Sequence, residues 1–192
     1  IGRKLAIRFW GYDPPATLVE EIASAYLDTG GDIKSMLRGV LREDWLMQAP
    51  PKLKRPFHYA LSALRTLSTE IHEYALLGEL LRGMEHLPFH WAPPNGYPDS
   101  LEYWGNYLMP RWTFAIWLIY QQGEVDLDLQ PYVAATTDEE FLDEIDARIF
   151  HSGNPPAHRE TIADYMSAAP GNLFRRLEAL SMALGAADFQ WH

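Results

Sequence analysis

Cysteine is absent from the 192 residues of the chain. Its absence excludes a disulfide framework, a zinc–thiolate site, an iron–sulfur cluster and a cysteine nucleophile. It does not fix the compartment, because exported proteins without cysteine are common.

Long apolar runs are missing as well. The longest, WTFAIWLIY, covers only Trp112–Tyr120, whereas a helix that crosses a bilayer needs about 20 apolar residues. We therefore expect no membrane span. No signal peptide is visible, but the chain begins IGRKLAIRFW without Met. We interpret it as the C-terminal part of a longer protein, so the missing signal says nothing about export, and the absent N-terminal half is itself a candidate partner.

Basic residues are scarce, with 16 Lys and Arg against 26 Asp and Glu and a net charge of −10. A field of this sign repels phosphate backbones, so we expect no nucleic-acid partner. The one basic cluster, PKLKRP, holds Lys52, Lys54 and Arg55. Three charges are too few for a phosphate track, and we expect a solvated loop.

Catalytic and metal-binding motifs are also lacking. The patterns SxxK and GxSxG do not occur, and EIHEY at 70–74 lacks the second histidine of HExxH. His86 and His90 are four residues apart, but Pro88 lies between them. We therefore expect no metal site and no cofactor. The paired carboxylates lie at helix starts and on polar faces, where acids are solvated.

Helix starts and stops are abundant instead. Gly30–Gly31 followed by Asp32, and Thr137 followed by Glu140, are typical of helix ends and N-caps. We expect Gly11 to end the first helix in a left-handed conformation, and Asp99 with Glu102 to begin a short helix. The predicted helices cover about 2–10, 14–29, 33–44, 56–67, 69–87, 110–122, 141–149, 156–168 and 173–184.

The prediction is thus an all-α fold, a single compact bundle of about eight short helices over residues 1–192, with a possible subdomain at 137–192. One segment, residues 124–136, is ambiguous. Val125, Leu127 and Leu129 alternate with acids as in a strand. Because no second strand is visible, we interpret the segment as an extended connector.

Aromatic residues are plentiful, with seven Trp, ten Tyr and eight Phe. Six of them lie in FHWAPPNGYPDSLEYW and just beyond, where three prolines stiffen the backbone. These rings could stack on a sugar or a peptide, or could close the core against the apolar helix that follows, which we favour. They are Phe89, Trp91, Tyr97, Tyr103, Trp104 and Tyr107.

Arg111 lies between Pro110 and Trp112, at the start of the most apolar predicted helix. A guanidinium there must be paired or solvated, and Asp99 or Glu102 could pair with it. We favour a structural clamp over the alternative, an anchor for a ligand carboxylate or phosphate.

Several stretches then occur in one order: RKLAIRFW, DPPATLVEEIASAYLDTGGDIKSMLRGVL, KLKRPFHYALSALRTL, PFHWAPPNGYPDSLEYWGN, PRWTFA and ADFQ. This order resembles the C-terminal half of a bacterial family, domain-of-unknown-function family 1800. Members of this family usually contain the motif PP-x-GWP, followed by a Trp and then by an Arg that lies before FA. Here the positions are Pro93, Pro94, Gly96, Tyr97, Pro98, Trp104 and Arg111, with Tyr97 in place of the usual Trp.

The resemblance implies a mostly helical bacterial protein that is often exported, and it implies no particular reaction. We therefore expect a non-catalytic helical binding or scaffold module. Its candidate residues for binding a glycan or a protein partner are Phe89, Trp91, Tyr97, Tyr103, Trp104 and Arg111. The alternative is a hydrolase or lyase acting on polysaccharide or peptide. Its candidate catalytic residues are His86, His90, Asp99 and Arg111.

Overall fold

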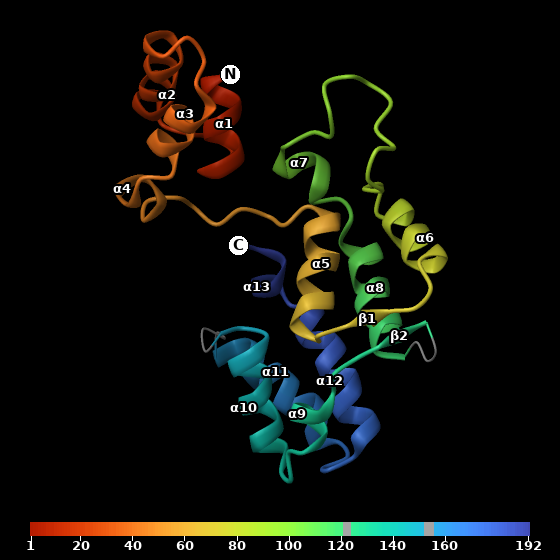
Figure 1. The fold of residues 1–192 in the computed structure, drawn as a ribbon. Coiled ribbons are helices and arrows are strands. Elements are labelled where there is room, and N and C mark those ends of the chain that lie inside the picture. The colour runs from red at the N-terminus through yellow and green to blue at the C-terminus, as the bar shows by residue number, and fades with distance from the viewer. Residues whose placement is uncertain (121–123, 152–155) are drawn as a thin grey trace. The chain divides into compact units, whose positions relative to one another are not determined.

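The fold was examined in a computed structural model that describes residues 1–120, 124–151 and 156–192 (Figure 1). The helices are α1 Gly2–Phe9, α2 Ala16–Asp28, α3 Ile33–Val40, α4 Glu43–Leu46, α5 Pro56–Thr66, α6 Ala75–Gly83, α7 Leu101–Trp104, α8 Leu108–Tyr120, α9 Gln130–Val133, α10 Asp138–Arg148, α11 Pro156–Ser167, α12 Leu173–Gly185 and α13 Ala187–Gln190. The strands are β1 Glu70–Ile71 and β2 Val125–Asp126.

The all-α class predicted from the sequence is confirmed. Across the described ranges there are thirteen helices and only one small sheet of two-residue strands. The helix count exceeds the predicted eight or so in part because three of the helices, α4, α9 and α13, are only four residues long. Such single turns leave little periodicity in the sequence.

Most of the helix caps predicted from the sequence are confirmed. Asp32 Oδ2 accepts the backbone N–H of Ser35 at 2.8 Å. Thr137 and Glu140 form a full capping box at the start of α10. Gly30 and Gly31 take φ values of 65° and 97°, a region that favours glycine, and they end α2 as expected.

Two local predictions are wrong. Gly11 is not among the described residues with positive φ; its role is steric, since a Cβ there would come within 2.9 Å of the Pro50 ring. At α7, the N-cap is Ser100, whose hydroxyl accepts the N–H of Tyr103, rather than Asp99.

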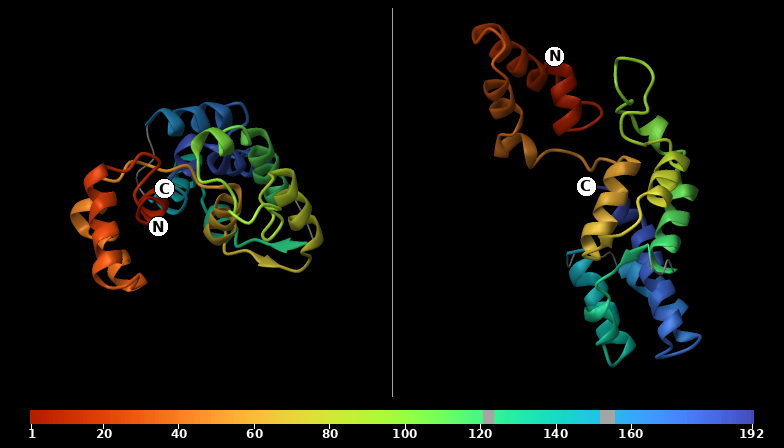
Figure 2. Two further views of the ribbon diagram at one scale, coloured as in Figure 1. Left: turned by 90° about the horizontal axis from the view of Figure 1, so that it is seen from above. Right: turned by 45° about the vertical axis from the view of Figure 1, so that its right-hand side comes forward.

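The predicted helix at 69–87 begins later than expected. Glu70–Ile71 instead forms β1, paired antiparallel with β2, with Glu70 opposite Asp126 (Figure 2, left). The connector interpretation of 124–136 is corrected by the same pair, because Val125–Asp126 does have a partner strand. Local periodicity could not show a partner so distant in the chain.

The contacts of the chain fall into two compact units. Unit 1 comprises residues 1–53 and 97–105. Within it, α2 packs against α1 and α3. At one crossing α1 and α2 approach so closely that a Cβ on Gly2 would lie 3.0 Å from the Val19 carbonyl oxygen. The buried core of these helices consists of Ala6, Leu18, Ile22, Met36 and Val40.

Unit 2 comprises residues 54–96 and 106–192. Its centre is the apolar helix α8, which packs against α12 and α5. Phe114 and Leu118 on α8 and Leu180 and Leu184 on α12 are fully buried. The single domain over 1–192 and the subdomain at 137–192 stay predictions.

Among the helices built from described residues, none combines the length and the apolar character that crossing a bilayer requires.

Candidate functional site: a polar pocket along α5

A polar stripe runs along α5 in unit 2. Lys54 lies just before the helix, and His58, Ser62 and Thr66 follow at intervals of four residues. Residues four apart share one face of a helix. All four side chains are half-buried. The opposite face is apolar and turns into the core through Tyr59, Ala60, Ala63, Leu64 and Leu67.

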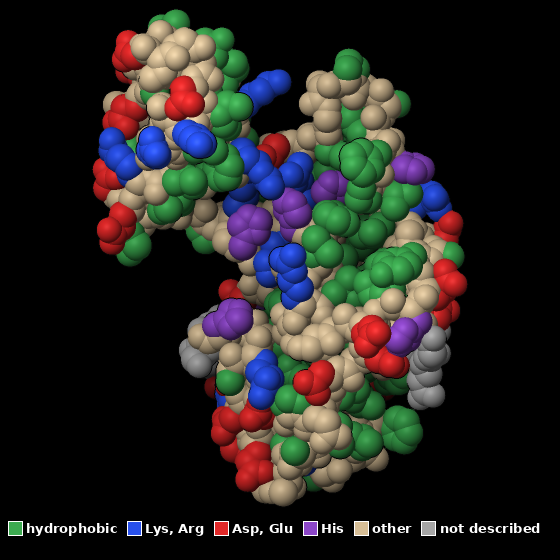
Figure 3. Space-filling view, in the orientation of Figure 1, with side chains coloured by type: hydrophobic (Ala, Val, Ile, Leu, Met, Phe, Trp, Pro, Cys, Tyr) green, Lys and Arg blue, Asp and Glu red, His purple; other side chains and the backbone are tan. Residues whose placement is uncertain are grey.

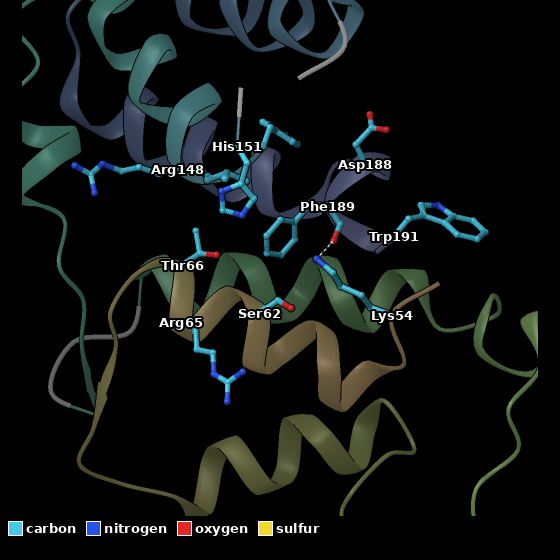
Figure 4. Close-up of a pocket in the computed structure, with 11 residues that line it drawn as sticks. Lys54, Ser62, Arg65, Thr66, Arg148, His151, Asp188, Phe189 and Trp191 are labelled. Carbon is cyan, nitrogen blue, oxygen red and sulfur yellow. Dashed lines mark hydrogen bonds between the residues drawn. The ribbon is translucent and has the colours of Figure 1, made fainter. Parts of the chain in front are cut away.

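Part of this stripe lines a cavity of about 530 Å³ (Figure 4). This volume lies within the range of small-molecule sites, roughly 300–1,000 Å³. The opposite wall comes from the end of α10 and the residues after it, and from α13. The lining residues are Lys54, Ser62, Arg65, Thr66, Arg148, Ile149, Phe150, His151, Asp188, Phe189 and Trp191.

Figure 4 shows how the polar side chains are directed. Ser62, Thr66 and His151 lie around the ring of Phe189, whereas the guanidinium groups of Arg65 and Arg148 lead away from it. Arg148 donates from Nε to Glu144 at 2.6 Å. The basic side chains that remain close to the cavity are therefore Lys54 and His151.

Lys54 is held firmly at the wall of the cavity. Its Nζ donates to the Phe189 carbonyl oxygen at 2.8 Å and lies 4.2 Å from the centre of the Phe189 ring. Its backbone N–H donates to the Gln190 carbonyl oxygen, also at 2.8 Å. Burial and, to a smaller extent, the positive charge of Arg111 lower the pKa of Lys54 to about 8.

No carboxylate in the described ranges lies within ion-pair distance of Lys54. The one acid in the lining, Asp188, is 2.7 Å from His158 Nδ1. Among the described residues, the ammonium is therefore compensated by a carbonyl dipole and an aromatic ring alone.

The other polar groups of the cavity also retain bonding capacity. Ser62, Thr66 and His151 make no side-chain hydrogen bond to another residue that the structure describes. His151 also has a φ of 50°, which is uncommon for a residue other than glycine and is often found at functional sites. Figure 3 shows Lys, Arg and His side chains gathered over the start of α5, and acidic side chains over α10.

Arg111, for which the sequence predicts either a structural clamp or a ligand anchor, is fully buried in unit 2. Its Nη1 donates to Gln190 Oε1 at 2.9 Å, and its guanidinium carbon lies 5.5 Å from the centre of the Tyr59 ring. Arg111 thus connects α8 to α13 and places a positive charge behind Lys54. A pairing with Asp99 or Glu102 would join the two units and stays a prediction.

The predicted catalytic histidines lie apart from this cavity's lining. His86 is buried, and its Nδ1 accepts the backbone N–H of Phe57 at 3.1 Å, so the neutral ring carries its proton on Nε2. Its ring centre is 6.3 Å from that of His58. His90 is exposed. Asp99 belongs to unit 1, where Lys52 binds it. Whether these residues act together stays a prediction.

The aromatic residues that the sequence predicts as a binding site are divided between the two units. Phe89 and Trp91 belong to unit 2, where the Phe89 ring is fully exposed and Trp91 Nε1 donates to Asn95 at 3.1 Å. Tyr97, Tyr103 and Trp104 belong to unit 1.

Trp104 is fully buried. Its Nε1 donates to the Pro98 carbonyl oxygen at 2.7 Å, and Tyr103 packs edge-on against it with ring centres 4.6 Å apart. In unit 2, the Tyr107 hydroxyl donates to Glu85 Oε2 at 2.6 Å. A ligand-binding role for the loop stays a prediction.

Within the described residues, no group of three or more His, Asp or Glu side chains is placed to hold a metal ion.

Sequence reasoning missed the cavity. The signal was present in KRPFHYALSALRT, where Lys54, His58, Ser62 and Thr66 recur every four residues on a helix that is otherwise apolar. The wall formed by α13 and residues 149–151 could not be inferred, because those residues are far away in the chain. The basic cluster at 52–55 was interpreted as a solvated loop, which is wrong for Lys52, since that residue is buried.

The fold and the pocket define an all-α protein with a half-buried, cation-lined site. The chain matches the family described as Protein of unknown function (DUF1800) over residues 1–191, and it belongs to that family. No curated protein and no solved structure matches it.

Proposed function

We propose that the protein is a helical binding module that takes a small carboxylate ligand in the α5 pocket. One observation carries the proposal: the half-buried ammonium of Lys54 reaches a cavity of about 530 Å³ with no carboxylate partner among the described residues. A buried charge without a counter-charge is unfavourable, and a bound anion would relieve that penalty.

The charge of the site favours a monoanion. Lys54 is the one ammonium in the lining, and the guanidinium groups of Arg65 and Arg148 lead away from the cavity (Figure 4). A carboxylate carries one negative charge and accepts several hydrogen bonds through its two oxygens. A phosphate dianion would keep excess negative charge in a partly desolvated place.

The remaining lining suits a ligand that also carries hydroxyl groups. Ser62 and Thr66 each offer a hydroxyl that both donates and accepts, one helical turn apart. Phe189 and Trp191 add apolar surface, on which the C–H face of a sugar-like molecule can pack. Together these groups favour a hydroxylated carboxylate, such as a sugar acid.

This proposal keeps the binding role expected from the sequence and places it at another site. Export and the hydrolase or lyase alternative stay predictions. So does a glycan or protein partner at Phe89, Trp91, Tyr97, Tyr103, Trp104 and Arg111. None of the contacts described above favours hydrolysis over binding.

The test uses two probes that differ only in the anionic group. D-Gluconate and D-sorbitol share a six-carbon hydroxylated chain, and only gluconate has a carboxylate. We expect gluconate to bind, measured by calorimetry, and to shift the backbone amide signals of Ser62, Thr66 and Phe189 in nitrogen-15 spectra. Sorbitol should bind at least roughly tenfold more weakly.

The Lys54→Met variant should lose gluconate binding, whereas Lys34→Met should retain it, because Lys34 is exposed on α3 of unit 1. Inorganic phosphate serves as the second anion, and we expect weaker binding than for gluconate. Equal binding of gluconate and sorbitol, or undiminished gluconate binding by a folded Lys54→Met variant, would refute the proposal.

A further inference from the structure

We propose that Lys54 is also a nucleophile, which captures a 2-oxo carboxylate in the α5 pocket as an imine. This inference rests on the proposed function, because the pocket must first hold the carboxylate of the ligand. It goes beyond that function in assigning a covalent step to Lys54.

The placement of the amine supports a nucleophilic role. Nζ reaches the cavity wall, and its position is fixed by the hydrogen bond to the Phe189 carbonyl oxygen at 2.8 Å. A neutral amine has two N–H groups and one lone pair. One N–H can keep the bond to Phe189, so the lone pair is free to approach a ligand in the cavity.

The surroundings of Lys54 make the neutral amine accessible near neutral pH. No described acid neutralises the ammonium, whereas Arg111 places a second cation nearby. With its pKa lowered to about 8, Lys54 is a free amine in a substantial fraction of molecules at pH 8. Desolvation and a neighbouring cation are the two recognised means by which proteins activate a lysine for imine formation.

The step balances without any oxidant or reductant. The Nζ lone pair attacks the carbonyl carbon, so the C–N bond forms while the C–O π bond breaks. The carbonyl oxygen gains a proton and the nitrogen loses one, which gives a carbinolamine. Loss of the hydroxyl group with a further proton releases one water and leaves the imine, and water reverses the sequence.

Other lining residues have defined parts in this reaction. The hydroxyls of Ser62 and Thr66 can donate to the oxygens of the ligand. The imidazole of His151, which has no hydrogen-bond partner among the described residues, is the group that can exchange the proton with the carbinolamine oxygen.

The test is reductive trapping on the intact chain. The wild-type protein is incubated with pyruvate and sodium cyanoborohydride at pH 8, and the modified lysines are identified by peptide mass spectrometry. We expect carboxyethylation of Lys54 at least roughly tenfold faster than that of the exposed Lys34 in the same sample, because its lowered pKa leaves more of the Lys54 amine unprotonated than an ordinary lysine has at pH 8. This comparison needs no variant and is therefore independent of folding defects.

Two further arms define the recognition. Lactate, which has the carboxylate but no carbonyl, should slow the trapping of pyruvate at Lys54. Acetaldehyde, which has the carbonyl but no carboxylate, should modify Lys54 more slowly than pyruvate does. The Lys54→Arg variant, which keeps the charge, should give no adduct at this position.

Trapping of Lys54 no faster than that of Lys34 would overturn the inference. If gluconate binding by the wild type persisted in that case, the binding function would stand and only the covalent step would fail. If neither gluconate nor pyruvate bound, the proposed function itself would fail.

Discussion

Lys52 and Asp99 form an ion pair in unit 1, with 2.9 Å between Nζ and Oδ2. The two side chains are only 8% and 21% exposed. Lys52 also donates to the backbone carbonyl oxygen of Ile7 at 2.5 Å. The pair therefore connects segment 97–105, which carries α7, to segment 1–53, which carries α1 to α4. A catalytic role for Asp99, which the sequence offers as an alternative, stays a prediction.

Replacing Asp99 with Ala should lower the free energy of unfolding by about 2–3 kcal/mol, because it leaves the ammonium of Lys52 buried without this carboxylate. Urea unfolding measures the change, and hydrogen exchange should show it in α1 and α7. Asp164→Ala is the matched control, since that aspartate is exposed and forms no ion pair with described residues. A loss no larger than the control's would mean that the pair contributes little.

A second prediction concerns the buried hydroxyl of Tyr59, which donates to the Arg111 carbonyl oxygen at 3.1 Å. Tyr59→Phe removes this bond while keeping the ring, so we expect a loss of about 1 kcal/mol in the free energy of unfolding. Tyr26→Phe, at an exposed position, should change it by less than about 0.5 kcal/mol. Indistinguishable results for the two variants would contradict the role assigned to Tyr59.

A third prediction follows from the lowered pKa of Lys54, about 8 in the folded protein against 10.5 as the ordinary value. Between these two pH values the unfolded chain binds more protons at this residue, so the contribution of Lys54 to stability becomes more favourable as pH rises. Below pH 8 the full penalty of the buried ammonium is present. Above pH 10.5 it has vanished.

Lys54→Met removes this titration. The stability of the wild type minus that of the variant should therefore increase steadily from pH 8 to pH 10, as measured by urea unfolding at several pH values. A difference that stayed flat or fell over this interval would show that the pKa of Lys54 is not lowered.

The sequence predicted those parts of the fold that depend on local chemistry. Asp32 and Thr137 cap the helices that follow them, because a cap needs only residues a few positions apart. The pairing of β1 with β2 and the burial of Lys52 depend on residues more than forty positions away. Local patterns carry no record of such contacts.

The candidate site, too, was predictable only where it depends on residues close together in the chain. The stripe from Lys54 to Thr66 is visible in the sequence as a four-residue spacing, but the opposite wall of the cavity includes Phe189 and His151, which are far away in the chain. The composition of the aromatic loop made it a candidate site, but composition does not show which of its rings are buried. In the structure Trp104 is fully buried and Phe89 is fully exposed, although both belong to one aromatic-rich stretch.

The most direct measurement of the central claim is the pKa of Lys54 itself, followed through its side-chain NMR signals with and without ligand. If a carboxylate binds beside the ammonium, binding favours the charged form, so saturating D-gluconate should raise the pKa from about 8 by roughly one unit. D-Sorbitol should leave it unchanged. A pKa that gluconate does not move would contradict the claim that the α5 pocket is a carboxylate site.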